Sequence, residues 1–480
     1  MKMARRGSAR RSWLLACAAF LLTGTASAQS IHLPPHEKIV LKNGLTVLLL
    51  EKHGVPIVSF RAVIKAGSAA DPAGQEGQAA VTAALLRKGT KTRSAQQFAS
   101  ELDFIGASFE SDANADYSSV SAECLTKDAA QGLALLSDAL LHATLPKEEV
   151  DKLLAQAIDG VKAAKDDPSQ VLGTYFYAYL FGPREYGRPE DGDERSLAQI
   201  QREGIAKFYE TYYVPGNVIL AVAGDFKTEE MKKRVDEVFG GWPAKQSPGV
   251  KSDPVTPVKG RRLLLVDKPD ATQTYFAIGN VGIAATDPDR VAIRVVNTVF
   301  GGRFTSMLNE ALRVESGLTY GAGAAFDERK ERGAFLMQSF TKNESTAQAI
   351  DLALEVLDQL HKNGITAEQL ASAKSYIKGQ FPPTIETSGA LARRIASNEF
   401  YGLDDNEVNQ LEARIDAVTL EGVRQVIAKH YPGENLVFTL IGKASEIGPA
   451  VKKYADKQDV RKIDEPGFGP EGKAGTSSQH

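Results

Sequence analysis

A short pattern occurs twice in the chain, and this repeat limits the possible folds more than any other feature. The spacing Tyr-x3-Asn-x6-Gly is found at residues 213–224 and again at residues 431–442, 218 residues later. In both copies an apolar run separates the Asn from the Gly, which predicts a helix end, a turn and a buried strand. A repeat of this length indicates two related domains rather than a solenoid of short units.

The two halves also begin alike. Apolar runs at residues 45–50 and 57–66 flank a charged turn, and residues 262–266 and 274–278 repeat that arrangement. Helical patterns follow in both halves, at residues 94–104, 148–164, 196–212, 345–362 and 367–379. Because the strands come in hairpin-like runs between helices, we expect an α+β fold. Each of two homologous halves would hold a mixed or mainly antiparallel sheet packed with helices.

Composition divides the chain into five segments. Its 480 residues are 43% hydrophobic and 24% charged, which is ordinary for a globular protein of several domains. A Pro- and Lys-rich stretch marks a linker, and the polar Gly- and Ser-containing end predicts disorder. The expected segments are a signal peptide (1–28), an N-terminal domain (29–245), a linker (246–260), a C-terminal domain (261–465) and a disordered tail (466–480).

The first 28 residues have the pattern of a secretory signal peptide. Five basic residues precede an apolar run at 13–22, and small residues before Gln29 offer a cleavage site. The run is too short to span a bilayer, so we expect a periplasmic or secreted protein. Arg10-Arg11 leaves twin-arginine export open beside the general route, and Cys17 leaves a lipoprotein box open although it lies inside the run.

The remaining composition excludes several classes of partner. Cleavage removes five positive charges from a net charge of −3, so the mature chain carries about −8 and shows no basic patch for nucleic acid. No second apolar segment predicts a membrane span. Cys124 is then the last cysteine, so an intrachain disulfide is impossible. No glycine-rich segment has the spacing of a phosphate loop, so nucleotide binding is not expected.

Residues 77–90, Gly-Gln-Ala-Ala-Val-Thr-Ala-Ala-Leu-Leu-Arg-Lys-Gly-Thr, carry a family resemblance. The segment resembles the helix on which the insulinase or pitrilysin family of inverted zinc metallopeptidases bears His-x-x-Glu-His. In this register the two histidines fall on Ala80 and Ala84, and the catalytic glutamate falls on Ala83. Counting back from the Asp-Pro turn at 167–168 places the family's third ligand, a glutamate, at Gly160.

These substitutions remove the chemistry of the motif. Zinc needs lone pairs from nitrogen, sulfur or carboxylate oxygen, and neither alanine nor glycine side chains supply them. The seven histidines are scattered, and only His32 and His36 are four residues apart. Pro34 and Pro35 between them forbid a helix there. We therefore expect no metal and no other cofactor in this chain.

The resemblance covers residues 36–450 and implies a role without the metal. In some bacterial pairs of the family's short-chain branch, one chain carries zinc and the other supplies an arginine and a tyrosine to a shared peptide chamber. The segment 301–321 resembles the one bearing that pair, which falls on Arg313 and Tyr320. The local pattern predicts a helix at 306–313 and a strand beginning at 318–320.

The pair suits peptide chemistry. A guanidinium can bind a peptide carbonyl or carboxylate through several donors, and a phenol can donate to a developing oxyanion. The alternative is structural: Arg313 as a solvated helix residue beside Glu310, and Tyr320 as a half-buried strand residue. Residues 105–120 predict a hairpin. The corresponding strand in active members extends by addition of a substrate strand, so here the hairpin either lines the chamber or has no role.

The resemblance implies a non-catalytic subunit of a secreted heteromeric zinc metallopeptidase, inactive alone. Such a chain would enclose a peptide chamber with a zinc-bearing homologous subunit, as a hetero-dimer or homo-dimer, and supply Arg313 and Tyr320 for substrate binding and oxyanion stabilisation. The alternative is a peptide-binding or scaffold pseudo-peptidase with no role in proteolysis. An autonomous peptidase with a different metal site is disfavoured, because the sequence offers no histidine cluster.

Overall fold

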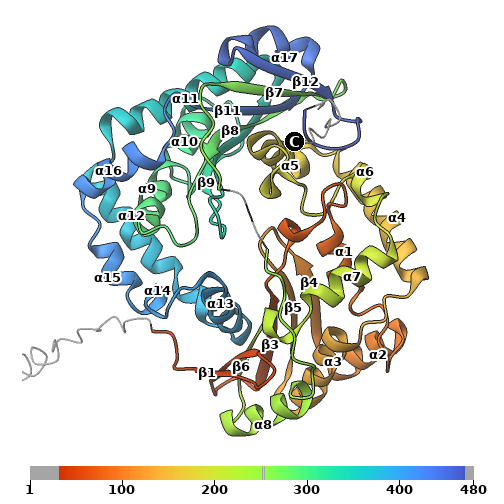
Figure 1. Ribbon diagram of the computed structural model, residues 1–480. Coiled ribbons are helices and arrows are strands. Elements are labelled where there is room, and N and C mark those ends of the chain that lie inside the picture. The colour runs from red at the N-terminus through yellow and green to blue at the C-terminus, as the bar shows by residue number, and fades with distance from the viewer. Residues whose placement is uncertain (1–31, 251, 253, 471–480) are drawn as a thin grey trace, which may run out of the picture.

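The computed structural model describes residues 32–250, 252 and 254–470, so the predicted signal peptide lies outside the described residues. Two halves face each other, each built on one six-stranded mixed sheet packed with helices (Figure 1). The α+β prediction is confirmed. In the described part of the chain, no helix is both long and apolar enough to cross a membrane.

The two sheets share a common order of five strands. The first sheet runs β1 (Glu37–Val40), β2 (Thr46–Glu51), β6 (Val218–Gly224), β3 (Ile57–Ile64), β5 (Ser118–Leu125) and β4 (Ser108–Ala113). The second runs β12 (Lys457–Lys462), β7 (Arg262–Asp267), β11 (Val437–Gly442), β8 (Gln273–Val281), β10 (Ala334–Lys342) and β9 (Ala322–Phe326). The orders β2-β6-β3-β5-β4 and β7-β11-β8-β10-β9 correspond, with one parallel pair followed by antiparallel pairs in each. The sixth strands differ, because β1 is antiparallel to β2 whereas β12 is parallel to β7.

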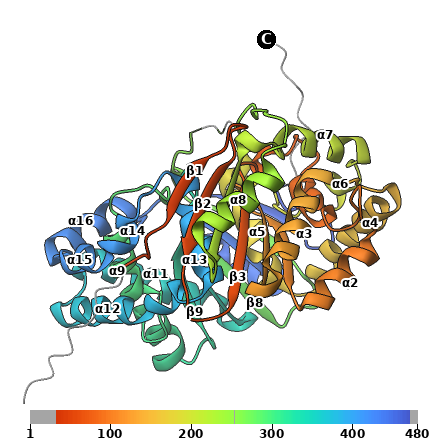
Figure 2. The ribbon, with the colours of Figure 1, turned by 90° about the horizontal axis from the view of Figure 1, so that it is seen from below.

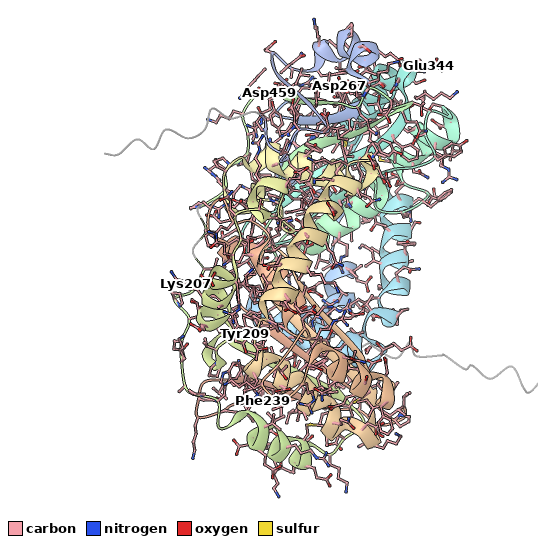
Figure 3. The ribbon with its side chains drawn as sticks, turned by 90° about the vertical axis from the view of Figure 1, so that its right-hand side faces the viewer. Lys207, Tyr209, Phe239, Asp267, Glu344 and Asp459 are labelled. Atoms are coloured by element: carbon pink, nitrogen blue, oxygen red, sulfur yellow. The ribbon has the colours of Figure 1, made fainter. Side chains whose placement is uncertain are left out.

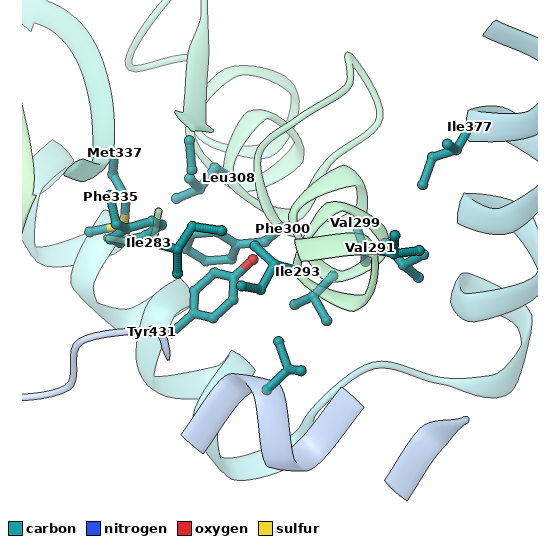
Figure 4. Packing of buried hydrophobic residues seen from close by; sticks show 14 of the residues in the cluster. Ile283, Val291, Ile293, Val299, Phe300, Leu308, Phe335, Met337, Ile377 and Tyr431 are labelled. Atoms are coloured by element: carbon teal, nitrogen blue, oxygen red, sulfur yellow. The ribbon is translucent and has the colours of Figure 1, made fainter. Parts of the chain in front are cut away.

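The repeated sequence pattern occupies equivalent places in the two sheets. It ends in β6 and β11, the strands that pair in parallel with β2 and β7. Tyr213 and Tyr431 are both buried, and Tyr431 packs among Phe300, Phe335 and neighbouring aliphatic side chains (Figure 4). Gly224 has a φ of 136°, and a Cβ there would lie 2.1 Å from a backbone oxygen of β3, so only glycine fits that strand end.

Helices cover the sheets in a sequence that alternates with the strands. Those of the first half are α1 (Gln78–Leu85), α2 (Ala95–Ile105), α3 (Ala129–His142), α4 (Lys147–Ala164), α5 (Pro168–Phe181), α6 (Glu194–Leu197), α7 (Arg202–Tyr212) and α8 (Thr228–Phe239). Those of the second half are α9 (Arg290–Phe300), α10 (Met307–Asn309), α11 (Thr346–Asn363), α12 (Ala367–Gln380), α13 (Ser388–Tyr401), α14 (Asn406–Asn409), α15 (Leu411–Asp416), α16 (Leu420–His430) and α17 (Ala444–Val451).

Most of the predicted helices match the observed ones to within about two residues. The single helix expected at 196–212 is instead two helices, α6 and α7. The α-helical hydrogen bonding stops between α6 and α7, where the amides of Gln199 and Ile200 donate to carbonyls three residues back. Asp193 is the N-cap of α6, and its side chain accepts hydrogen bonds from the amides of Arg195 and Ser196. The break lets Leu197, Ile200 and Ile205 all enter one buried apolar cluster with α1 and α4.

Both faces of the first sheet are buried, by helices from different halves. Leu49 and Val222 point to the face that α3 and α8 cover, whereas Leu48 and Ala221 point to the opposite face. That opposite face is covered by α13 of the second half, which contacts β3 and β6 (Figure 1). Seen from below, β1, β2 and β3 run alongside α8 on the outer face (Figure 2). The near-continuous apolar character of these strands follows from this double burial.

The second sheet receives a helix from the first half in return. α5 contacts β8 and β11, and its residues Val171, Tyr175 and Phe176 share a buried cluster with Leu264 and Val437 of the sheet. The apolar residues of α5 lie nearly all round the helix, as expected for a helix enclosed on most sides. The halves therefore exchange α5 and α13, and each sheet is completed by the other half.

The linker and the C-terminal end are more ordered than composition suggests. Within the described residues of 246–260 there is no helix or strand, yet the amide of Val258 donates to Asn280 at 2.9 Å. The predicted tail, 466–480, begins too early. Phe468 is buried and packs edge-to-face on Tyr175 of α5, at 5.0 Å between ring centroids. Burial of the Phe468 ring therefore fixes residues that their composition assigns to a disordered tail. Residues 471–480 lie outside the described chain.

Candidate functional site

The three positions of the degenerate motif lie on one short helix, α1. Ala83 is fully buried, whereas Ala80 and Ala84 are half-buried. α4 packs beside α1, and Gly160 on α4 is exposed, with no atom within 4 Å of where a Cβ would stand. The frame of the inverted motif is therefore present as neighbouring helices. These side chains do not fit a zinc ion, because methyl groups and a glycine offer no donor atom.

The start of α1 is fixed by a buried carboxylate. Asp71 accepts hydrogen bonds from the amides of Gly77 and Ala79, both at 2.8 Å. Burial raises the pKa of Asp71 to about 8, although these amides at the helix N-terminus oppose that rise. Gly77 has a φ of 93°, and a Cβ there would meet the Asp191 carbonyl oxygen at 2.8 Å, which explains the leading glycine.

Among the described residues, one group of three possible metal ligands comes together, and it lies in the other half. Asp287, Asp289 and His430 bring their ligand atoms within 4.8 Å of one another. Lys429 donates to the same Asp289 oxygen, at 2.6 Å, that His430 contacts at 2.8 Å. A lysine and a histidine already occupy that oxygen, so the group forms a polar contact between α16 and the start of α9.

Arg313 lies on a π-helical segment, Glu310–Glu315, which continues α10. The helix predicted at 306–313 is present, and after its first turn it is π-helical rather than α-helical. The amide of Ser316 donates to the carbonyl of Ala311 at 3.1 Å, five residues back. Such wide turns are rare and are found often at functional sites. The Arg313 guanidinium lies 4.7 Å from the centre of the Phe304 ring, in cation–π contact.

Tyr320 follows in a loop that hydrogen bonds hold firmly. Ser339 donates to the carbonyl of Gly321 at 2.9 Å, and Thr341 donates to the carbonyl of Leu318 at 2.7 Å, so β10 fixes both ends of the loop. β9 begins only at Ala322, and the prediction of a strand from 318 is wrong, since the Thr319 hydroxyl accepts from the Gly321 amide instead. Tyr320 is 79% exposed, so it is not the half-buried strand residue of the alternative.

The fold brings Arg313 and Tyr320 together in one depression of about 490 Å³. Lys342 and Glu344, from the end of β10 and the turn after it, line the same depression. Figure 3 shows Glu344 at the end of the molecule that the second half forms. Sequence reasoning missed these two charged residues, and also the contact of Phe304 with Arg313. Phe304 lies in the segment that bears the resemblance, but nothing in its spacing predicts that contact.

The two hairpins end the sheets differently. The predicted hairpin at 105–120 is confirmed, as β4 and β5, and β4 is an edge whose outer side pairs with no strand in the described chain. The equivalent edge strand of the second sheet is β9, and residues of the second half accept hydrogen bonds from its outer amides. Its amides at Ala322 and Ala324 donate to Asn309 and to the Gly301 carbonyl. Only β4 thus offers a free edge for strand addition at these two places.

Two sequence models of one peptidase family match the chain. The model described as "Insulinase (Peptidase family M16)" matches residues 46–190, and "Peptidase M16 inactive domain" matches residues 199–377. The chain belongs to this family. α1 lies within the first match, and Arg313 and Tyr320 lie within the second. The resemblance noted in the sequence is confirmed at the level of the family.

Known relatives and structures agree with the assignment. An uncharacterized zinc protease of Streptomyces coelicolor is 26% identical over 75% of this chain and 79% of its own length. The uncharacterized zinc protease YmxG of Bacillus subtilis is 24% identical over 82% of this chain and 96% of its own length.

Two solved structures have the same fold. A peptidase M16 inactive domain from Pseudomonas fluorescens superposes with a TM-score of 0.80 at 24% identity, covering 85% of this chain and 98% of its own. The first half of the periplasmic protease PqqL from Escherichia coli gives a TM-score of 0.70 at 17% identity, covering 89% and 98%.

Proposed function

We propose that this chain is the non-catalytic subunit of a periplasmic or secreted heteromeric zinc metallopeptidase, paired with a zinc-bearing homologue. The observation that carries the proposal is the contrast between two places in one fold. The zinc-motif helix keeps its position but has alanine at every reactive site, whereas Arg313 and Tyr320 share one open depression. Relatives named zinc proteases and a structural neighbour named a periplasmic protease support the chemistry and the compartment.

In this proposal the partner's metal site supplies the activated water, and this chain binds and orients the peptide. Arg313 offers guanidinium donors to a peptide carbonyl or carboxylate, and Phe304 stacked on it limits its freedom. The Tyr320 hydroxyl donates to the scissile carbonyl oxygen as negative charge develops there. The loop that bears Tyr320 is bonded to β10, which holds its backbone in place and lowers the entropic cost of binding.

The experiment combines the mature chain with a zinc-bearing homologue and measures peptide hydrolysis and metal content. We expect cleavage by the mixture only, with zinc in the homologue only. Within the mixture, Tyr320→Phe lowers kcat by about 10²- to 10³-fold, as loss of an oxyanion donor does in other enzymes. Arg313→Ala lowers kcat/KM. Tyr376→Phe and Arg424→Ala, exposed residues of the same half outside the depression, serve as matched controls.

A second function, a peptide-binding or scaffold pseudo-peptidase, is favoured by the loss of every metal-site residue on α1 and α4. The same assay separates the two. Full activity of the Arg313→Ala and Tyr320→Phe mixtures, with assembly intact by gel filtration, supports the scaffold and rejects catalytic support. Hydrolysis and stoichiometric zinc in the isolated chain reject both.

A further inference from the structure

A second cavity, of about 150 Å³, lies between α9 and α13 and gathers positive charge. Arg290 and Arg294 line it from α9, and Arg394 lines it from α13. Two carboxylates, Glu328 and Glu407, also line it. The cavity lies in the second half and shares no lining residue with the depression at Arg313 and Tyr320.

One of the carboxylates is already used. Glu407 forms an ion pair with Arg290 and accepts a hydrogen bond from Arg414 at 2.9 Å. Arg290 also donates to the carbonyl of Ala285 at 3.1 Å. Glu407 is therefore shared between two guanidiniums, and neither of its carboxylate oxygens pairs with Arg294 or Arg394.

Among the described residues, Arg294 and Arg394 form no direct ion pair, although Glu328 of the same cavity attracts both. Across the part of the chain that the structure describes, neither guanidinium has a carboxylate within 4.0 Å or forms a hydrogen bond. Arg394 is half-buried, and burial together with the like charge of Arg294 lowers its pKa, an effect that the charge of Glu328 opposes. Glu328 forms no ion pair either, and burial raises its pKa. Two arginines that repel each other therefore share one carboxylate that pairs directly with neither, and an anion bound between them would lower the cost of their partial desolvation.

We propose that this cavity binds one small oxyanion, a phosphate or a carboxylate group, between Arg294 and Arg394. Planar guanidinium forks match both groups, which each accept two parallel hydrogen bonds. The volume limits the ligand: water occupies about 30 Å³ in the liquid, so the cavity holds an ion of a few heavy atoms but not a nucleotide or a peptide. The side chain of Glu328 lines the same space.

The position gives the anion a structural consequence. Arg394 is on α13, the helix that the second half contributes to the first sheet. Tyr401, at the end of α13, lines the cavity and also donates to Asp116 of the first half at 3.2 Å. An anion that ties α13 to α9 therefore steadies the contact between the halves.

The test is calorimetric titration and thermal unfolding of the mature chain, with sodium phosphate or sodium acetate added at fixed ionic strength in chloride. We expect saturable binding of one anion per chain. At a concentration 100 times Kd, the folding equilibrium constant rises about a hundredfold. Arg294→Gln combined with Arg394→Gln abolishes binding and the rise. Arg393→Gln, an exposed neighbour on α13 outside the cavity, leaves both unchanged.

Comparison of the phosphate and acetate titrations also identifies the class of ligand. Saturation by phosphate and not by acetate assigns a phosphate site, and saturation by acetate assigns a carboxylate site. Arg394→Lys keeps the charge but loses the fork, so it weakens binding without abolishing it. An equal response in the double variant, or no saturable binding of either anion to the unsubstituted chain, overturns the proposal.

Discussion

Rebuilding the zinc site on α1 and α4 tests whether the family frame has been placed correctly. The perturbation is Ala80→His, Ala84→His and Gly160→Glu in one chain. Ala80 and Ala84 are half-buried, four residues apart on one helical face, and no atom lies within 4 Å of a Cβ at Gly160. The new side chains therefore have room, and two histidines at this spacing with one glutamate are the ligand set of the inverted zinc peptidases.

The expected magnitude follows from linkage. A ligand that binds only the folded state stabilises it by about 2.7 kcal/mol when its concentration is 100 times Kd. We therefore expect the triple variant to bind one zinc per chain by elemental analysis and to gain about 2.7 kcal/mol in free energy of unfolding at that zinc concentration. The unsubstituted chain should gain nothing.

The fourth position behaves differently. Ala83 has no exposed surface, so Ala83→Glu forces a larger, charged side chain into a filled site. Overpacking alone costs about 1–3 kcal/mol, and burial of the carboxylate adds to that. We expect Ala83→Glu to lower the free energy of unfolding by at least about 2 kcal/mol, measured by urea denaturation, without affecting zinc binding by the other three. Absence of zinc from a folded triple variant would refute the register on Ala80, Ala83 and Ala84.

Three further predictions concern packing and charge. Ile395→Ala on α13 should cost about 2–5 kcal/mol in urea unfolding because its side chain is buried in the apolar cluster that spans both halves, whereas Arg393→Ala should change stability by less than about 0.5 kcal/mol. Phe468→Ala should cost about 3–5 kcal/mol, and a change near zero would restore the predicted tail boundary. Glu51 accepts the Thr228 amide and hydroxyl, and these bonds, with His53, lower its pKa from 4.5 to about 2. Its stabilising effect is present above pH 4.5 and lost as the pH falls towards 2, and Glu51→Gln should flatten that slope, although exposure keeps the effect small.

The sequence predicts the strands and the repeat well because both depend on local burial. Residues of β6 and β11 face helices on both sides, so their apolar runs are unbroken and can be recognised without knowing the partner helices. The same holds for the α+β class. What could not be predicted is which helix covers which sheet, since the apolar surfaces of α5 and α13 are the same whether they pack on their own half or on the other.

The candidate site shows the same division. Arg313 and Tyr320 could be named from the pattern around them, and the depression that joins them depends on features with no sequence signal. The π-helical turn ends in a hydrogen bond from the Ser316 amide to the Ala311 carbonyl, and before β9 the Thr319 hydroxyl bonds its own loop. The arginines of the second cavity, Arg294 and Arg394, are 100 residues apart, so their proximity is a property of the tertiary fold alone.

The exposure of Tyr320 argues that the depression is built for a ligand and is not a by-product of folding. A large aromatic side chain that is 79% exposed contributes little hydrophobic stabilisation to the chain that bears it. Hydrogen bonds from the Ser339 and Thr341 hydroxyls of β10 nevertheless hold the backbone of this loop in place. Phe304, which is 62% exposed, contacts the Arg313 guanidinium. Rigid aromatic and arginine side chains with low stabilising value are the residue types that dominate binding energy at interfaces. On α1 the opposite holds, since its alanines pack and offer no donor atom to a ligand.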